Sequence, residues 1–268
     1  MSLTTNENII TREKRGHVYL IGLNRPDKKN AFNLALLREL STALGELEND
    51  TELRVGVIFA HGDSFTSGLD LMDVAPLMGS GQPILAEGAI DPVGIHGPRC
   101  SKPLICAVHG VCLTFGIELM LASDIVIAGE NSRFAQIEIK RGIFPFGGAT
   151  QRWIAASGWG NAMRYLLTGD ELDAATAFRI GMVQEVVPVE QVLPRALALA
   201  QTIAAQAPLG VIATLRSGRL AVEHGHAAAV TELAPEIQRL MKTDDAREGG
   251  TSFMQRRPAV FQGRGNLA

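Results

Sequence analysis

The sequence of 268 residues lacks the short motifs that mark several large enzyme classes. It has no P-loop, no GxGxxG after a predicted strand, no HExxH zinc motif and no GxSxG nucleophile motif. The pair His224 and His226 has no third candidate ligand near it in the sequence, so we expect no metal site. These absences exclude P-loop nucleotide hydrolysis, Rossmann-type redox chemistry, zinc proteolysis and esterase chemistry of the common kinds.

The sequence also has no excess of positive charge and few cysteines. The formal net charge is −3, so no excess of lysine and arginine exists to neutralise a nucleic-acid backbone. The three cysteines are an odd number and none forms a CxxC pair, which is typical of reduced thiols in a cytosolic protein. The N-terminus lacks the charged-then-apolar layout of a signal peptide. We therefore expect a cytoplasmic protein with no nucleic-acid partner.

One apolar run, residues 104–122, approaches the length of a membrane span. His109, Gly110, Gly116 and Glu118 interrupt it. A buried strand, a glycine turn and a buried helix explain this composition better than a span does. We therefore expect no membrane association.

The rest of the composition, with 46% hydrophobic and 20% charged residues, is that of a globular α/β chain. Hydrophobic runs predict strands at 17–23, 55–60, 105–108 and 125–128. Helical spacing predicts helices at 33–49, 116–122, 193–206, 227–242 and 244–255, and Pro208 opens a further helix. Strands that alternate with helices indicate a mainly parallel sheet, followed here by a helical tail.

Four segments carry a pattern in a fixed order along the chain. They are Asn24–Phe32, Ser64–Leu71, Ala107–Leu119 and Phe134–Arg152. With Arg247–Pro258 near the end, they resemble the crotonase superfamily, the enoyl-CoA hydratase/isomerase family, over nearly the whole chain. The resemblance implies an α/β fold built as a crotonase-like spiral of repeated strand-strand-helix units with a C-terminal helical region. We expect residues 1–200 to form the core with the active site, and residues 201–268 to form a helical oligomerisation region.

Glycines at two turns are suited to close approach of the backbone. Gly68 and Gly116 each lie beside a turn that can aim an N–H group into a cleft. Phe115 and Gly116 also begin a helix, where unpaired N–H groups cluster. Two such donors can polarise a carbonyl and stabilise an enolate. Composition alone leaves two ordinary glycine turns as the alternative.

Two glutamates are candidates for acid–base chemistry. Glu118 lies in an apolar helix, where a carboxylate needs a partner or a function. An ion pair with Arg141 or Arg152 is the structural alternative. Glu138 lies in an alternating segment, residues 136–140, which is also typical of a solvent-exposed edge.

The resemblance implies a role for each candidate residue. Glu118 activates water for attack on the β-carbon of a 2-enoyl thioester, and Glu138 handles the proton at the α-carbon. The backbone N–H groups of Leu69 and Phe115 form the oxyanion hole. The further residues expected to bind substrate or CoA are Lys28, Ser67, Gly68, Asp70, Gly116 and Phe146.

The expected activity is that of an enoyl-CoA hydratase, because both glutamates are present. The alternatives are an enoyl-CoA isomerase or other crotonase-type acyl-CoA enzyme, and a catalytically weak acyl-CoA-binding homologue. The resemblance implies no metal or redox cofactor, since CoA arrives as part of the acyl-CoA or enoyl-CoA substrate. It also implies a homotrimer or a hexamer made as a dimer of trimers.

Phe115 and Phe146 depart from the family pattern, which has glycine at both positions. If the backbone keeps a glycine-like conformation, we expect strain of about 1–3 kcal/mol at each. A ring at Phe146 would displace the catalytic water or shorten the acyl pocket, which predicts weak or selective hydratase activity. The alternative is that both rings point into the core and change nothing.

Overall fold

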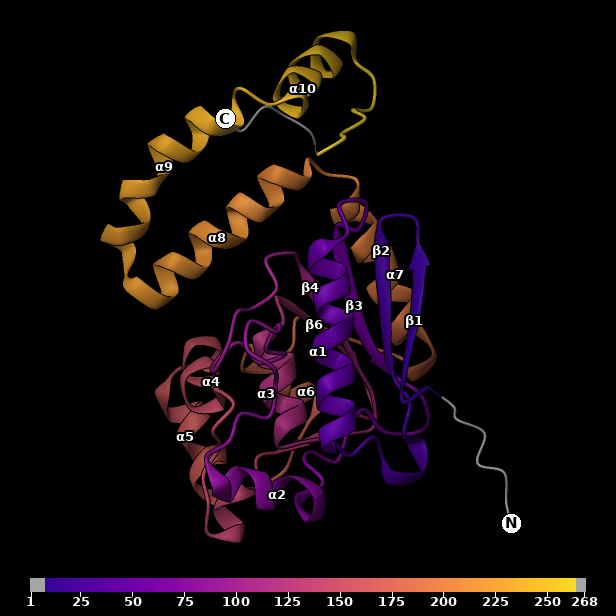
Figure 1. The fold of residues 1–268 in the computed structure, drawn as a ribbon, viewed down its shortest axis with the longest axis vertical. Helices are drawn as coiled ribbons and strands as arrows, with labels where there is room; N and C mark the ends of the chain where they lie inside the picture. The colour runs from indigo at the N-terminus through magenta and orange to yellow at the C-terminus, as the bar shows by residue number, and fades with distance from the viewer. Residues whose placement is uncertain (1–7, 264–268) are drawn as a thin grey trace.

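The computed structural model describes residues 8–263, and a six-stranded sheet lies at its centre (Figure 1). In spatial order the strands are β1 (Ile10–Arg15), β2 (Val18–Leu23), β3 (Val55–Ala60), β4 (Leu104–Val108), β6 (Ile125–Gly129) and β9 (Glu185–Val187). The β1–β2 pair is antiparallel, and all the other pairs of this sheet are parallel. The predicted α/β class with a mainly parallel sheet is confirmed.

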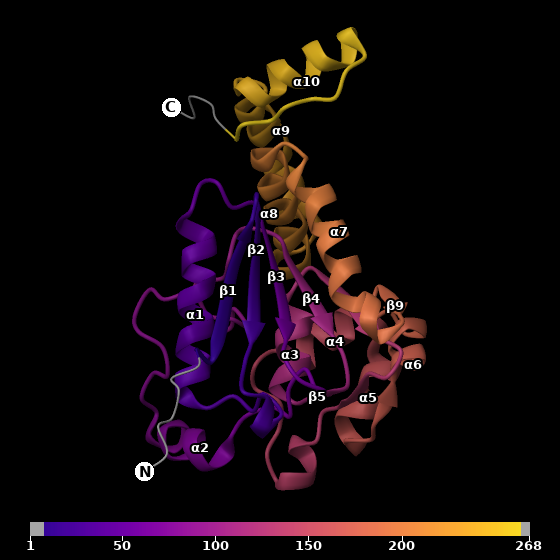
Figure 2. The ribbon, with the colours of Figure 1, turned by 90° about the vertical axis from the view of Figure 1, so that its right-hand side faces the viewer.

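Helices cover both faces of this sheet, as Figure 2 shows for α1 (Leu34–Asn49) and α7 (Val192–Ala204). The side chain of Asn33 caps α1 by accepting the N–H of Leu36 at 2.9 Å. The buried stripe of α1 consists of Leu36, Leu37, Leu40, Leu44 and Leu47. Burying such a leucine contributes about 1.5–3 kcal/mol. Small alanines on α7 let that helix lie close against the opposite face.

A second, three-stranded sheet carries part of the site. Its strands are β5 (Val111–Leu113), β7 (Arg133–Ala135) and β8 (Leu172–Asp173). Helix α3 (Phe115–Ala122) follows β5 after one residue, and the 3₁₀ turn η2 (Glu138–Arg141) follows β7. Because β5 and β7 pair in parallel, the segments that leave both strands emerge at the same edge.

Further elements complete the body of the fold. The helices are α2 (Leu71–Ser80), α4 (Ala149–Ser157), α5 (Trp159–Thr168) and α6 (Ala174–Arg179), and the remaining 3₁₀ turns are η1 (Pro26–Lys28) and η3 (Val189–Gln191). All three cysteines are buried and free. Within residues 8–263 no single helix has the length and apolarity to cross a membrane; Val189–Ala204 and Pro208–His224, bent by 106°, pass on length and composition only when taken together.

The last three helices extend from one end of the body (Figure 1). They are α8 (Pro208–His224), α9 (His226–Leu240) and α10 (Asp244–Gln255), as the sequence predicted to within a few residues. Two ion pairs tie α8 to the body, Arg219–Asp124 at 3.0 Å and Arg99–Glu223 at 2.7 Å. The division at residue 200 and the oligomerisation role stay predictions, and residues 1–7 and 264–268 of the two predicted units lie outside the described residues.

Candidate active site

Glu118 lies on α3 and is only 1% exposed. Its Oε1 accepts the backbone N–H of Gly147 at 2.6 Å and that of Ala149 at 3.5 Å. Burial raises the pKa of this carboxyl, while the two N–H donors and the nearby charge of Arg152 act against the rise. The expected burial is confirmed. The ion-pair alternative is wrong, because no arginine of the described chain lies within ion-pair distance of Glu118.

The backbone of Gly147 lies very close to the carboxylate of Glu118. A Cβ atom at this position would lie 2.4 Å from Glu118 Oε2 and 2.8 Å from its Cδ. No side chain fits there while the carboxylate keeps its place. Sequence reasoning did not single out Gly147, although the Gly147-Gly148 pair directly after Phe146 is a signal for a close backbone approach.

Glu138 begins η2 and is 7% exposed. The solvent-exposed edge that its alternating segment suggested is therefore wrong. Its Oε1 accepts the side-chain amide of the fully buried Gln136 at 2.9 Å, and its buried Oε2 has no partner among the described residues. Burial raises the pKa of Glu138 to about 7, and the negative charge of Glu118 adds to this rise. Gln136 is a second site residue that sequence reasoning missed.

Burial raises the pKa of both carboxylates, but their hydrogen-bond partners differ. Glu118 accepts two backbone N–H groups, which favour its ionised form. The unpartnered oxygen of Glu138 and the nearby negative charge of Glu118 favour the protonated form of Glu138. Such a pair can supply one base and one acid at neutral pH. Because the groups interact, the proton is best assigned to the pair, with Glu138 its preferred holder.

The loops before Leu69 and Phe115 lie side by side. Leu113 donates its N–H to Thr66 O at 3.0 Å, and Thr66 bridges to Cys112. Among residues 8–263, neither the N–H of Leu69 nor that of Phe115 has a hydrogen-bond acceptor. Two neighbouring N–H groups are therefore free to donate to one ligand oxygen.

Gly68 and Gly116 are needed for the approach of these loops. A Cβ atom at Gly68, where φ is +96°, would lie 1.8 Å from Thr114 Oγ1. A Cβ atom at Gly116 would lie 2.4 Å from the methyl carbon of Thr66. The expected close approach is confirmed at both positions, and in both cases the neighbour is the other loop.

Neither phenylalanine carries the backbone strain expected of a glycine-like conformation. Positive φ occurs at Thr114 instead, directly before Phe115. The Phe115 ring is 7% exposed and packs edge-on against Phe32, with the ring centres 4.9 Å apart. Phe115 thus fits the core alternative, whereas Phe146 is only half-buried.

The residues expected to bind CoA come from two segments that the fold joins. Phe32 and Leu69 form a β-bridge, and Ser67 donates its N–H to Lys29 O at 2.9 Å. Lys28 is exposed, and Ser67 is half-buried. Asp70 forms an ion pair with Arg25 at 2.9 Å, so its carboxylate already has a cationic partner.

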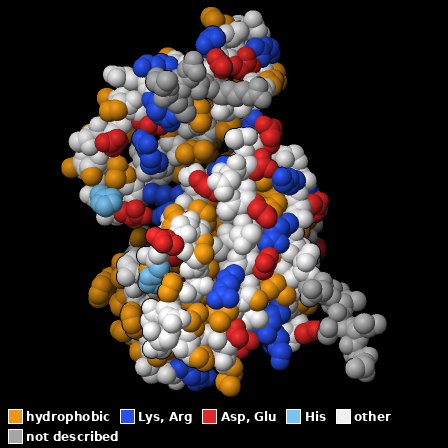
Figure 3. Space-filling view, viewed as in Figure 1, with side chains coloured by type: hydrophobic (Ala, Val, Ile, Leu, Met, Phe, Trp, Pro, Cys, Tyr) orange, Lys and Arg blue, Asp and Glu red, His pale blue; other side chains and the backbone are white. Residues whose placement is uncertain are grey.

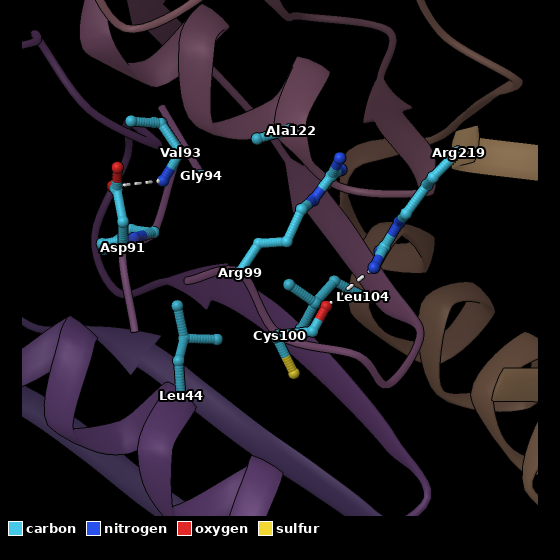
Figure 4. Close-up of a pocket in the computed structure, with 10 residues that line it drawn as sticks. Leu44, Asp91, Val93, Gly94, Arg99, Cys100, Leu104, Ala122 and Arg219 are labelled. Atoms are coloured by element: carbon cyan, nitrogen blue, oxygen red, sulfur yellow. Dashed lines mark hydrogen bonds between the residues drawn. The ribbon is translucent and has the colours of Figure 1, made fainter. Parts of the chain in front are cut away.

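A separate hollow lies near the far end of α3, and none of the predicted site residues lines it (Figure 4). Its lining comprises Leu44, Asp91, Pro92, Val93, Gly94, Arg99, Cys100, Leu104, Ala122 and Arg219. Arg219 reaches it from α8 and donates to the Cys100 carbonyl at 2.8 Å. Over the described part of the chain, no three His, Cys, Asp or Glu side chains come together as metal ligands would.

Comparison with known proteins agrees with the geometry of the site. The family model described as Enoyl-CoA hydratase/isomerase matches residues 13–264. The chain is 36% identical to 2,3-dehydroadipyl-CoA hydratase of Escherichia coli (strain K12), covering 97% of this chain and 100% of that protein. It is 33% identical to enoyl-CoA hydratase EchA19 of Mycobacterium tuberculosis (strain ATCC 25618 / H37Rv), covering 94% and 96%.

Solved structures are similar along almost the whole chain. A probable enoyl-CoA hydratase/isomerase from Mycobacterium abscessus matches with a TM-score of 0.92 and 52% identity, covering 95% of this chain and 98% of that one. An enoyl-CoA hydratase from Mycobacterium tuberculosis H37Rv matches with a TM-score of 0.86 and 32% identity, covering 96% and 100%. The predicted crotonase-like fold is confirmed.

Proposed function

We propose that this chain is an enoyl-CoA hydratase, a hydro-lyase that adds water reversibly across the double bond of a 2-enoyl-CoA thioester. The chain belongs to the enoyl-CoA hydratase/isomerase family, as its motifs predicted. The observation that carries the proposal is the pair of buried carboxylates with different hydrogen-bond partners. Adding water needs a base for the oxygen nucleophile and an acid for the neighbouring carbon. A double-bond isomerase moves one proton and can work with a single carboxylate.

Each group has one task in the proposed reaction. Ionised Glu118 takes a proton from water as the oxygen bonds to the β-carbon. The electron pair of the double bond moves toward the thioester oxygen, where the N–H groups of Leu69 and Phe115 stabilise the enolate. Protonated Glu138 then gives its proton to the α-carbon. Proton exchange with solvent returns both carboxyls to their starting forms.

The proposal includes an acyl-CoA substrate, no metal or redox cofactor, and a cytoplasmic location. We infer that the loop 67–70 and Lys28 contact the CoA part of the substrate, as the family pattern predicts, and the hydrogen bond from Ser67 N–H to Lys29 O supports a shared surface for the two segments. Acid–base chemistry with backbone donors supplies each step of hydration, so the reaction needs no bound redox group.

We further propose that the chain assembles as a homotrimer, or as a hexamer of two trimers. Figure 3 shows hydrophobic side chains exposed over the C-terminal helices. Those on α8 and α9 and just after them are Val222, Val230, Leu233, Ile237 and Met241. Apolar surface of this kind is typical of a subunit interface. Light scattering tests the proposal, and a mass near the 28.7 kDa of one chain would contradict it.

The activity is tested with crotonyl-CoA, whose conjugated enoyl-thioester absorbance disappears on hydration. We expect turnover by the parent protein and a fall of about 10²–10⁴-fold in kcat for Glu118→Gln and for Glu138→Gln. Glu130→Gln, an exposed glutamate, is the matched control and should behave as the parent. Gain of that absorbance from a 3-enoyl-CoA, without hydration of crotonyl-CoA, would replace the proposal by isomerase activity.

A further inference from the structure

Thr114 has an unusual backbone conformation next to the site. Its φ is 47° and its ψ is −112°, a combination that is sterically disfavoured for residues with a Cβ and more so for a β-branched one. Lys29 and Arg256 also have positive φ, but their ψ values of 42° and 40° place them in the ordinary left-handed region. Thr114 precedes α3, yet its side chain makes no capping hydrogen bond. Helix capping therefore does not compensate this strain.

The backbone on both sides of Thr114 is fixed by hydrogen bonds. Its N–H donates to Ala135 O at 3.0 Å. Its carbonyl accepts the N–H of Ile117 at 2.9 Å and that of Glu118 at 3.2 Å. The surrounding structure thus holds the strained residue in place and leaves the next N–H, that of Phe115, without an acceptor among the described residues.

The Thr114 hydroxyl lies at the junction of the two loops with free N–H groups. It occupies the space that a side chain at Gly68 would need. Gly68 directly precedes Leu69, and Thr114 directly precedes Phe115. The hydroxyl therefore lies beside the residue that precedes one free donor and belongs to the residue that precedes the other. The hydroxyl does not cap α3, and none of the side-chain hydrogen bonds found within residues 8–263 involves it.

We propose that the Thr114 hydroxyl is a third hydrogen-bond donor to the thioester oxygen and hence a catalytic residue, an inference that rests on the proposed hydratase function. A glycine would adopt this backbone conformation without strain but would leave backbone donors alone at the oxygen. Threonine adds a donor beside the position where negative charge develops. Hydrogen bonds to a charged acceptor strengthen, so this contact favours the enolate over the bound substrate.

Three substitutions separate the hydroxyl from the strain. Thr114→Val keeps the branched shape and removes the hydroxyl, and we expect kcat/KM on crotonyl-CoA to fall about 10²-fold. Thr114→Ser keeps the hydroxyl and should stay within a few-fold of the parent. Thr114→Gly relieves the strain, so it should melt no lower than the parent and still lose activity as the valine variant does. Thr42→Val, at an exposed position of α1, is the matched control.

A conjugated dienoyl-CoA thioester provides a readout that needs no turnover, because hydrogen bonds that polarise its carbonyl move its absorption to longer wavelength. We expect a smaller shift with Thr114→Val than with Thr114→Ser or the parent. If the parent shows the shift but does not hydrate crotonyl-CoA, the proposed function fails while this comparison still tests Thr114. Equal shifts in the serine and valine variants, no shift in the parent, or higher activity in the valine or glycine variant would overturn the Thr114 proposal.

Discussion

Gly147→Ala changes the surroundings of Glu118 by one methyl group. The new Cβ would lie 2.4 Å from Glu118 Oε2, whereas ordinary contacts begin at 3.4 Å, so the carboxylate must retreat by about 1 Å. That movement breaks or bends the 2.6 Å hydrogen bond from the Gly147 N–H. A displacement of about 1 Å at a reacting group can cost about 10²-fold in rate. We therefore expect kcat to fall about 10²-fold with little change in affinity for the CoA ester.

The assay is crotonyl-CoA hydration, with calorimetric binding of the saturated analogue butyryl-CoA to measure affinity separately. Gly160→Ala is the matched control, because its Cβ meets open space on α5 and alanine favours a helix by about 0.5–1 kcal/mol. Gly147 has no positive φ, so the contact with Glu118 is the difference between the two variants. Parent-like turnover of Gly147→Ala would refute the assignment of Glu118 as a precisely held base.

Three further predictions concern the charges and the ring at the site. Burial raises the pKa of Glu138 to about 7, and hydration needs its protonated form. We therefore expect kcat/KM in the hydration direction to fall as the pH rises above about 7, and a flat profile from pH 6 to 9 would contradict this. Arg152→Met removes a charge that favours ionised Glu118, so the acid limb of the same profile should move to higher pH, and an unmoved limb would exclude this influence. Phe146→Gly should raise kcat/KM on crotonyl-CoA if the ring restricts the site, and no gain would show that the half-buried ring is harmless.

Elements with local signals could be predicted from the sequence. The leucines of α1 recur at helical spacing over a short stretch of sequence, and the helix begins directly after its capping residue Asn33. The two- and three-residue strands β5, β7, β8 and β9 were missed, because such short segments show no periodicity. The edge strand β1 was missed because most of its side chains are polar and partly exposed, as is common at sheet edges.

The site residues that belong to sequence motifs could be predicted. The glutamates and the two donor loops follow from the family pattern, and their burial and free N–H groups agree with it. Gly147, Gln136 and Thr114 were missed, because their importance lies in contacts with residues that fold beside them. A sequence shows that Gly147 lacks a side chain, but only the structure shows the carboxylate that occupies the space.

Hydration of crotonyl-CoA in a mixture of D₂O and oxygen-18 water would test the two-carboxylate reaction most directly. If Glu118 delivers water to the β-carbon and Glu138 a solvent-derived proton to the α-carbon, mass spectrometry should find 3-hydroxybutyryl-CoA with oxygen-18 at the β-carbon and a single deuterium at the α-carbon. Glu118→Gln should slow incorporation of both labels together. Recovery of unhydrated thioester, with no label or with deuterium alone, would contradict the proposed hydratase reaction.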